Sequence, residues 1–147
     1  MKVDYKLEFT GVLKVANVPD HNKCIYTNEC LEQAFKEYAA RDRPMLGAIF
    51  EPTLSMPIRL EDVAFEIQEL KLESVGEQLR LETRCRPLET PKGKVLTQLL
   101  ELERLNPGTF SMGMSGVAEE IEEKDGVRIV KKFKIERVTF LKTEDKA

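Results

Sequence analysis

Residues 63–85 read VAFEIQELKLESVGEQLRLETRC and carry the clearest pattern in the chain. Apolar residues occupy every second position from Val63 to Ile67. The phase then slips at Gln68–Glu69, which predicts a β-bulge. Residues 74–77 (SVGE) have turn-forming composition, and the alternation resumes beyond them. The stretch therefore predicts two antiparallel strands joined by a tight turn.

The two ends of the chain repeat this strand pattern. From Val3 to Val15 the apolar residues share one parity and the charged residues the other, which predicts one long half-buried strand that bends at Gly11. Lys124-Asp125-Gly126 has the composition of a hairpin turn, and the strand after it should run from Val127 to about Leu141.

Two helices are expected, near residues 28–40 and 92–104. Thr27 can cap the first, and Leu31, Ala34, Phe35 and Tyr38 give it one apolar face. Thr90-Pro91 opens the second, because proline is well suited to the first helical position, where its missing N–H costs nothing.

These elements predict an α+β fold, a small, mostly antiparallel β-barrel flanked by two main helices. The 147 residues suit a single domain spanning 1–147. Its globular core should cover residues 1–141, and residues 142–147 should form a frayed tail.

Composition restricts the classes of function. A net charge of −3 disfavours nucleic-acid binding, which needs clustered cations. The chain lacks an apolar run of the ~18 residues that a membrane helix needs, so no membrane partner is expected. The first residues do not resemble a signal peptide, which favours the compartment of synthesis. No metal-ligand spacing or phosphate loop occurs, so no cofactor and no metal site are expected. The three cysteines, which are expected to be reduced, are Cys24, Cys30 and Cys85.

Catalytic candidates are few. Ser115 stands between two glycines, as a nucleophile on a tight turn would, but with no partner base a plain turn serine is the simpler interpretation. His21 is the only histidine, and it lies in the polar loop NVPDHNK. A solvent-exposed loop residue is the simpler interpretation of His21, and a relocated base for Ser115 or Ser111 is the alternative.

Five short motifs occur in an order that resembles the tailed-phage prohead (capsid maturation) serine proteases, a family that shares its fold with the herpesvirus capsid proteases. They cover the chain from about Val18 to Val138. The motifs are Asn22–Tyr26 (NKCIY), Met45–Pro52 (MLGAIFEP), Val63–Phe65 (VAF), Thr90–Lys94 (TPKGK) and Gly113–Ala118 (GMSGVA).

The resemblance implies a serine nucleophile activated by histidine, and this chain departs from that pattern. Ser115 holds the nucleophile position, but Glu51 and Phe65 occupy the positions where the family has its histidine bases. Val117 stands where an arginine is expected. A serine hydroxyl needs a base within hydrogen-bond reach, and an ordinary glutamate is a poor match at neutral pH. The chain is therefore expected to have no catalytic residues, and Ser115 is expected to be a vestige of the nucleophile position.

The resemblance thus favours a non-enzymatic phage virion or head-assembly protein, such as a capsid decoration, minor head or scaffold-associated protein. Its partner would be the major capsid protein or the scaffold protein, and self-association is left open. Its location would be the virion and, during assembly, the host cytoplasm. Two alternatives stay open: an active prohead endopeptidase that uses Ser115, and a small α+β binding module unrelated to phage heads.

Residues 45–57 are the predicted contact surface, because apolar side chains there lie among prolines that restrict the backbone. The simpler alternative is that these side chains fold onto the sheet as core. The proposed binding residues are Met45, Phe50, Leu54 and Met56.

Overall fold

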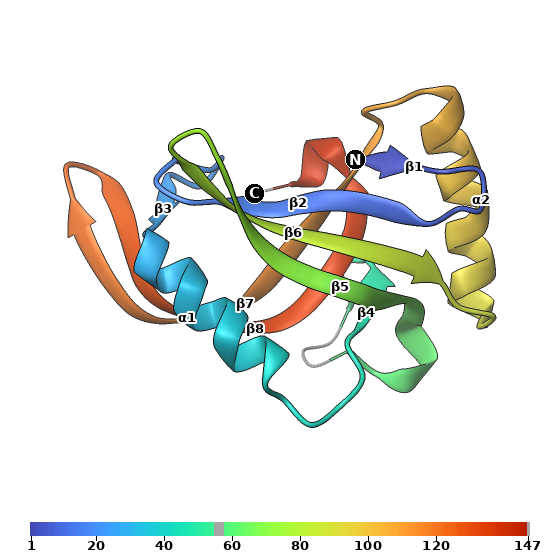
Figure 1. The fold of residues 1–147 in the computed structure, drawn as a ribbon, viewed down its shortest axis with the longest axis horizontal. Helices are drawn as coiled ribbons and strands as arrows, with labels where there is room; N and C mark the ends of the chain where they lie inside the picture. Colours follow the sequence, from blue (N-terminus) through green and yellow to red (C-terminus); the bar gives the residue numbers. More distant parts are fainter. Residues whose placement is uncertain (55–57, 147) are drawn as a thin grey trace.

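The computed structural model describes residues 1–54 and 58–146, which form eight β-strands, two α-helices and two short 3-10 helices (Figure 1). The strands are β1 (Lys2–Val3), β2 (Phe9–Val15), β3 (Cys24–Tyr26), β4 (Leu46–Ile49), β5 (Val63–Val75), β6 (Gln78–Pro87), β7 (Phe110–Lys124) and β8 (Val127–Lys142). The helices are α1 (Asn28–Ala39) and α2 (Pro91–Leu105), with η1 (Leu60–Asp62) and η2 (Thr143–Asp145) as the 3-10 helices.

The β5–β6 hairpin confirms the prediction from residues 63–85. The two strands pair antiparallel, and the register shifts between Ile67 and Glu69, where the sequence places the bulge. Gly76 in the turn has a φ of 63°, a left-handed conformation that glycine adopts without steric cost. The β7–β8 hairpin is also confirmed, since Asp125 and Gly126 both have the positive φ of a two-residue hairpin turn.

β8 organises the sheet. One edge pairs antiparallel with β7 along almost its whole length, and the other pairs in parallel with β3 near Ile129 and with β4 near Thr139. The strand order is β1-β2-β6-β5-β4-β8-β3, with β7 also on β8. The sheet is mostly antiparallel but open, because no backbone pairing joins β2 to β7 among the described residues. The α+β class is therefore confirmed, whereas the closed barrel is not.

The prediction of one continuous strand from Val3 to Val15 is wrong in the middle of that range. Asp4 interrupts it, since its Oδ1 accepts hydrogen bonds from the backbone N–H groups of Lys6 and Glu8. Leu7 adopts a φ of 65°, so the chain reverses and β1 pairs antiparallel with β2. A side chain–backbone turn has overridden the alternating pattern here.

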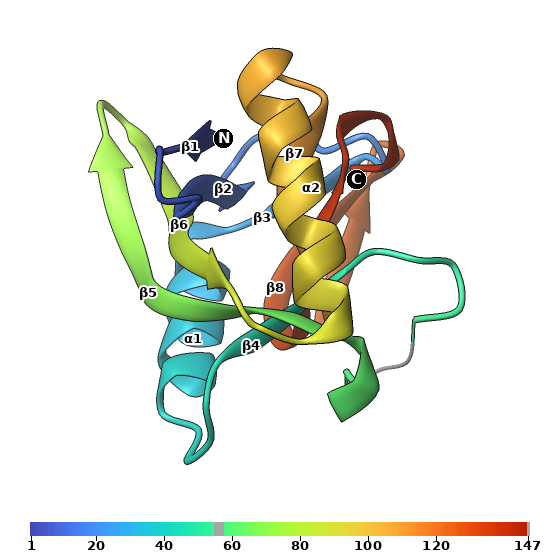
Figure 2. The same ribbon diagram turned by 90° about the vertical axis from the view of Figure 1, so that its right-hand side faces the viewer.

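Both predicted helices are present. Thr27 accepts a hydrogen bond from Cys30 N, and Thr90 accepts one from Gly93 N, with Pro91 at the start of α2. α1 lies against β8, whereas α2 packs across the ends of β5 and β6 (Figures 1 and 2). Within the described ranges, neither helix is long and apolar enough to cross a membrane.

The core is built around a group of phenylalanine rings. Phe9 packs edge-on against Phe65 and Phe140, with ring centroids 5.4 and 6.0 Å away, and Phe110 stacks on Phe140 at 4.9 Å. These contacts join β2, β5, β7 and β8. Ring packing in the core therefore stabilises the curvature of the open sheet.

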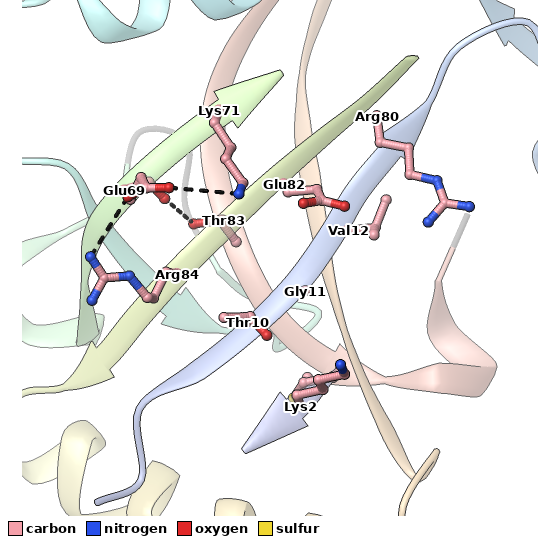
Figure 3. Close-up of a pocket in the computed structure, with 11 residues that line it drawn as sticks. Lys2, Thr10, Gly11, Val12, Glu69, Lys71, Arg80, Glu82, Thr83 and Arg84 are labelled. Carbon is pink, nitrogen blue, oxygen red and sulfur yellow. Dashed lines mark hydrogen bonds and ion pairs between the residues drawn. The ribbon is translucent and has the colours of Figure 1, made fainter. Parts of the chain in front are cut away.

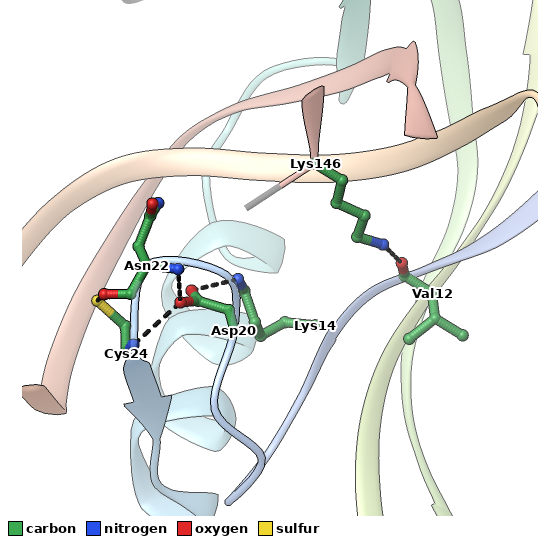
Figure 4. Close-up of polar contacts among 6 residues, drawn as sticks. All are labelled: Val12, Lys14, Asp20, Asn22, Cys24 and Lys146. Carbon is green, nitrogen blue, oxygen red and sulfur yellow. Dashed lines mark hydrogen bonds and ion pairs between the residues drawn. The ribbon is translucent and has the colours of Figure 1, made fainter. Parts of the chain in front are cut away.

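The end of the chain is not the frayed tail that the sequence predicts. Thr143 N donates to Thr109 O, and η2 then leads to Lys146. The Lys146 ammonium donates a 2.7 Å hydrogen bond to the backbone oxygen of Val12 on β2 (Figure 4). The last described residues therefore bind to β2, and Asp145 and Lys146 line a cavity together with residues of β2 and β7.

Candidate functional site around Ser115

Ser115 lies on β7 directly opposite Arg137 on β8. The Nε atom of Arg137 donates a 2.6 Å hydrogen bond to Ser115 Oγ, and its Nη1 atom donates a 2.7 Å hydrogen bond to the backbone oxygen of Leu54. The register shifts immediately after Ser115, and Gly116 fits there because a Cβ would collide with the backbone oxygen of Lys134. This bulge sets the direction of the Ser115 side chain.

Arg137 can stabilise negative charge on Ser115, but it cannot activate the Ser115 hydroxyl as a nucleophile. A guanidinium has five N–H donors and no acceptor, and it stays protonated at any physiological pH. It therefore cannot take the proton that a serine must lose to attack a carbonyl carbon.

Glu51 is bonded to a different partner. It lies beyond the end of β4, where its Oε1 is 2.7 Å from Nζ of Lys92 at the start of α2. This hydrogen bond and the carboxylate charge raise the pKa of Lys92. Among the described residues, no hydrogen bond joins Glu51 to Ser115.

Phe65 belongs to the core. Its side chain is fully buried, and its ring fills the space above Gly47, where a Cβ would collide with it. Val117, at the expected arginine position, is 51% exposed. The structure thus does not join Ser115, Glu51 and Phe65 into one bonded group, and the arginine beside Ser115 comes from β8.

Among the described residues, no hydrogen bond joins His21 to Ser115 either. It is exposed, in the loop between β2 and β3, and borders a separate cavity of about 280 Å³ with Val18, Pro19 and Lys146. Its position agrees with the simpler interpretation of a loop histidine.

A small cavity of about 140 Å³ opens beside Ser115. Its polar lining comes from four segments of the chain: β2, β7, β8 and the chain end. The polar side chains are those of Lys14, Ser115, Arg137, Thr139, Asp145 and Lys146. Gly113, opposite Thr139, keeps the floor open because it has no side chain.

Lys146 is a partly buried cation of this cavity. Burial and the nearby charge of Lys14 lower the pKa of Lys146 to about 8. Lys14 itself forms an ion pair with Asp20, 3.3 Å between Nζ and Oδ2 (Figure 4).

Three of the predicted contact residues, Met45, Phe50 and Leu54, are half-buried. Met45 packs against the core, and Phe50 continues the β4 pairing through a hydrogen bond from its N–H to Phe140 O while its side chain lines the cavity beside Ser115. Leu54 meets Arg137 through its carbonyl. Met56 lies outside the described residues. Met45, Phe50 and Leu54 are therefore neither bare surface nor fully buried core.

A groove of about 520 Å³ lies over β2, β5 and β6 and contains a charge ladder (Figure 3). Glu69 is opposite Arg84, and Lys71 is opposite Glu82. Opposite charges face each other across the strands, which stabilises the sheet. The groove borders none of the predicted site residues, and its charges do not converge on one point.

Sequence reasoning missed Arg137, Thr139 and Lys146. In residues 135–141 (IERVTFL), Arg137 stands beside the apolar residues Val138, Phe140 and Leu141, and a cation in a strand with several buried positions was the available signal. Lys146 gave no signal, because its position depends on how the chain end folds back onto β2.

No family model and no curated protein matches the chain. The fold is prohead-protease-like, as the motif order implied. One solved structure that the chain matches is that of the capsid assembly protease gp21 of bacteriophage T4. The two share 21% sequence identity, and the alignment covers 92% of this chain and 81% of the gp21 chain with a TM-score of 0.71.

Proposed function

We propose that this chain is a non-enzymatic component of phage head assembly, built on the fold of a capsid assembly protease. The observation that carries the proposal is the bonding of Ser115. Its Oγ accepts from Arg137, which cannot act as a base, while Glu51 is bound to Lys92 and Phe65 is buried. A retained fold with an unactivated serine is what a former protease kept for binding would have.

The fold also suggests the class of partner. The similar solved protein is described as a capsid assembly protease. We propose the major capsid protein or the scaffold protein as the partner, met in the host cytoplasm during assembly and retained in the virion. The half-buried segment with Met45, Phe50 and Leu54 is the contact surface that we propose.

One observation favours the alternative of an active endopeptidase. Lys146 has a lowered pKa and borders the same cavity as Ser115. An uncharged lysine can act as the base for a serine. Against this, the ammonium of Lys146 is directed to Val12 O. The third alternative, a module unrelated to phage heads, has no observation in its favour beyond the small size of the domain.

The test compares three phage genomes: wild type, a deletion of this reading frame, and Ser115→Ala. The proposal predicts that the deletion lowers the yield of filled heads. The phage with Ser115→Ala should give the same yield as wild type, with unchanged masses of capsid and scaffold fragments. Accumulation of uncleaved precursors in Ser115→Ala would show an enzyme instead.

A further inference from the structure

Two cations beside Ser115 have no negative partner among the residues that the structure describes. Arg137 donates to a hydroxyl and to a backbone carbonyl, and Lys146 donates to a backbone carbonyl. Neither forms an ion pair with any residue in ranges 1–54 and 58–146. Partly buried cations usually have a counter-charge, because desolvation penalises them.

None of the other described charged groups around the cavity forms an ion pair with Arg137 or Lys146. Lys14 adds a third cation, which Asp20 neutralises. Asp145 also borders the cavity, but it forms no ion pair with Arg137 or Lys146. The lowered pKa of Lys146 agrees with a positive site, since the charge of Lys14 contributes to it.

The cavity has the size and donors for one small anion. Its volume is about 140 Å³, and a water molecule takes ~30 Å³. The hydroxyls of Ser115 and Thr139 border the same space as the two cations, so donors converge from β7, β8 and the chain end. Arg137 has the planar donor arrangement that pairs well with carboxylates.

We propose that this cavity binds a carboxylate, supplied by the C-terminus of a peptide or by an Asp or Glu side chain of a partner segment. The inference does not depend on the proposed function, because the cations would bind a carboxylate whether or not Ser115 reacts. The net charge of −3 disfavours a polyanion such as nucleic acid as the source.

The test is an NMR titration with three peptides: acetyl-Ala-Ala with a free carboxylate, its C-terminal amide, and acetyl-Glu-Ala-amide. The first or the third should shift the backbone amides of Gly113, Ser115 and Thr139 in a saturable way, and the one that does so identifies the source. The bound carboxylate should also raise the pKa of Lys146. Equal shifts with the neutral amide would overturn the proposal.

Two variants and one control locate the site. Arg137→Gln should weaken binding about tenfold or more, as expected for a charge-assisted pair. Gly113→Ala leaves all charges in place but adds a methyl group to the cavity floor, 3.8 Å from Thr139 Oγ1, and should weaken binding as well. Lys142→Gln, an exposed cation on the same strand, should have no effect.

If Lys142→Gln weakens binding as much as Arg137→Gln, the attraction is only general charge and the proposal is wrong. If Arg137→Gln fails to fold, Gly113→Ala decides: unchanged affinity in that variant contradicts a site in this cavity.

Discussion

Arg137 Nε lies 2.6 Å from Ser115 Oγ, and Arg137 Nη1 lies 2.7 Å from the backbone oxygen of Leu54. One side chain on β8 thus holds both the serine and the segment that follows β4. This arrangement connects the candidate site to the stability of its surrounding loop.

Arg137→Gln should therefore release the loop around Leu54. Loss of two hydrogen bonds to a charged group should lower the free energy of unfolding by about 3–6 kcal/mol. Hydrogen exchange should also become faster in the described residues 50–54. Ser115→Ala removes only one of the two bonds and should leave the exchange of this loop unchanged. Equal exchange in wild type and Arg137→Gln would show that Arg137 does not hold the loop.

Gly47→Ala should be strongly destabilising. Its new Cβ would overlap the buried ring of Phe65, which is fixed by Phe9 and cannot move away. Such overpacking costs about 1–3 kcal/mol. The matched control is Gly113→Ala, whose Cβ would lie 3.3 Å from the flexible side chain of Leu141. Urea denaturation should separate the two, and equal midpoints would contradict the account of the core.

Phe50→Asp tests the proposed contact surface. Phe50 is half-buried and borders a cavity with Arg137 and Lys146, so an aspartate there gains cationic neighbours and the melting temperature should change little. Incorporation of the protein into particles should be lost, as measured by quantitative mass spectrometry of purified heads. A large fall in melting temperature would instead make Phe50 part of the core.

Titration of Lys146 should make the stability of the fold depend on pH in the alkaline range. Its folded pKa of about 8 lies below the ~10.4 of an unfolded lysine. Between these values the unfolded chain binds the proton that the folded chain has released, so the free energy of unfolding increases with pH in this window. Below this pH window, Lys146 is charged in both the folded and the unfolded state. The folded state then bears the full cost of burying the ammonium.

The measurement is the difference in unfolding free energy between wild type and Lys146→Gln across this range. The difference should shift in favour of wild type as the pH rises from about 8 to about 10, since other titrating groups cancel. A flat difference would mean that Lys146 is solvated and not bound to Val12.

Local patterns predicted the parts of the fold that depend on neighbouring residues. The bulge near Gln68, the turn at Asp125-Gly126 and the caps at Thr27 and Thr90 follow from short-range chemistry, and all are present. The reversal at Asp4 to Glu8 was missed because the alternating pattern hides a turn made by one aspartate side chain.

The candidate site was harder to predict because it depends on register across distant strands. Ser115 was identified from its motif, but Arg137 lies beside it only because β7 and β8 pair with a bulge after Ser115. Phe65 was taken as a lost base position from motif order alone, and its burial under Gly47 required the three-dimensional packing.

The reactivity of Ser115 is the most direct test of a non-enzymatic role. Purified protein is treated with a fluorophosphonate probe near neutral pH and again at about pH 9, above the folded pKa of Lys146, and its intact mass is measured. The account predicts no added mass at either pH, because no base serves Ser115. Stoichiometric labelling that disappears in Ser115→Ala would contradict it, and labelling only at the higher pH would identify Lys146 as the base.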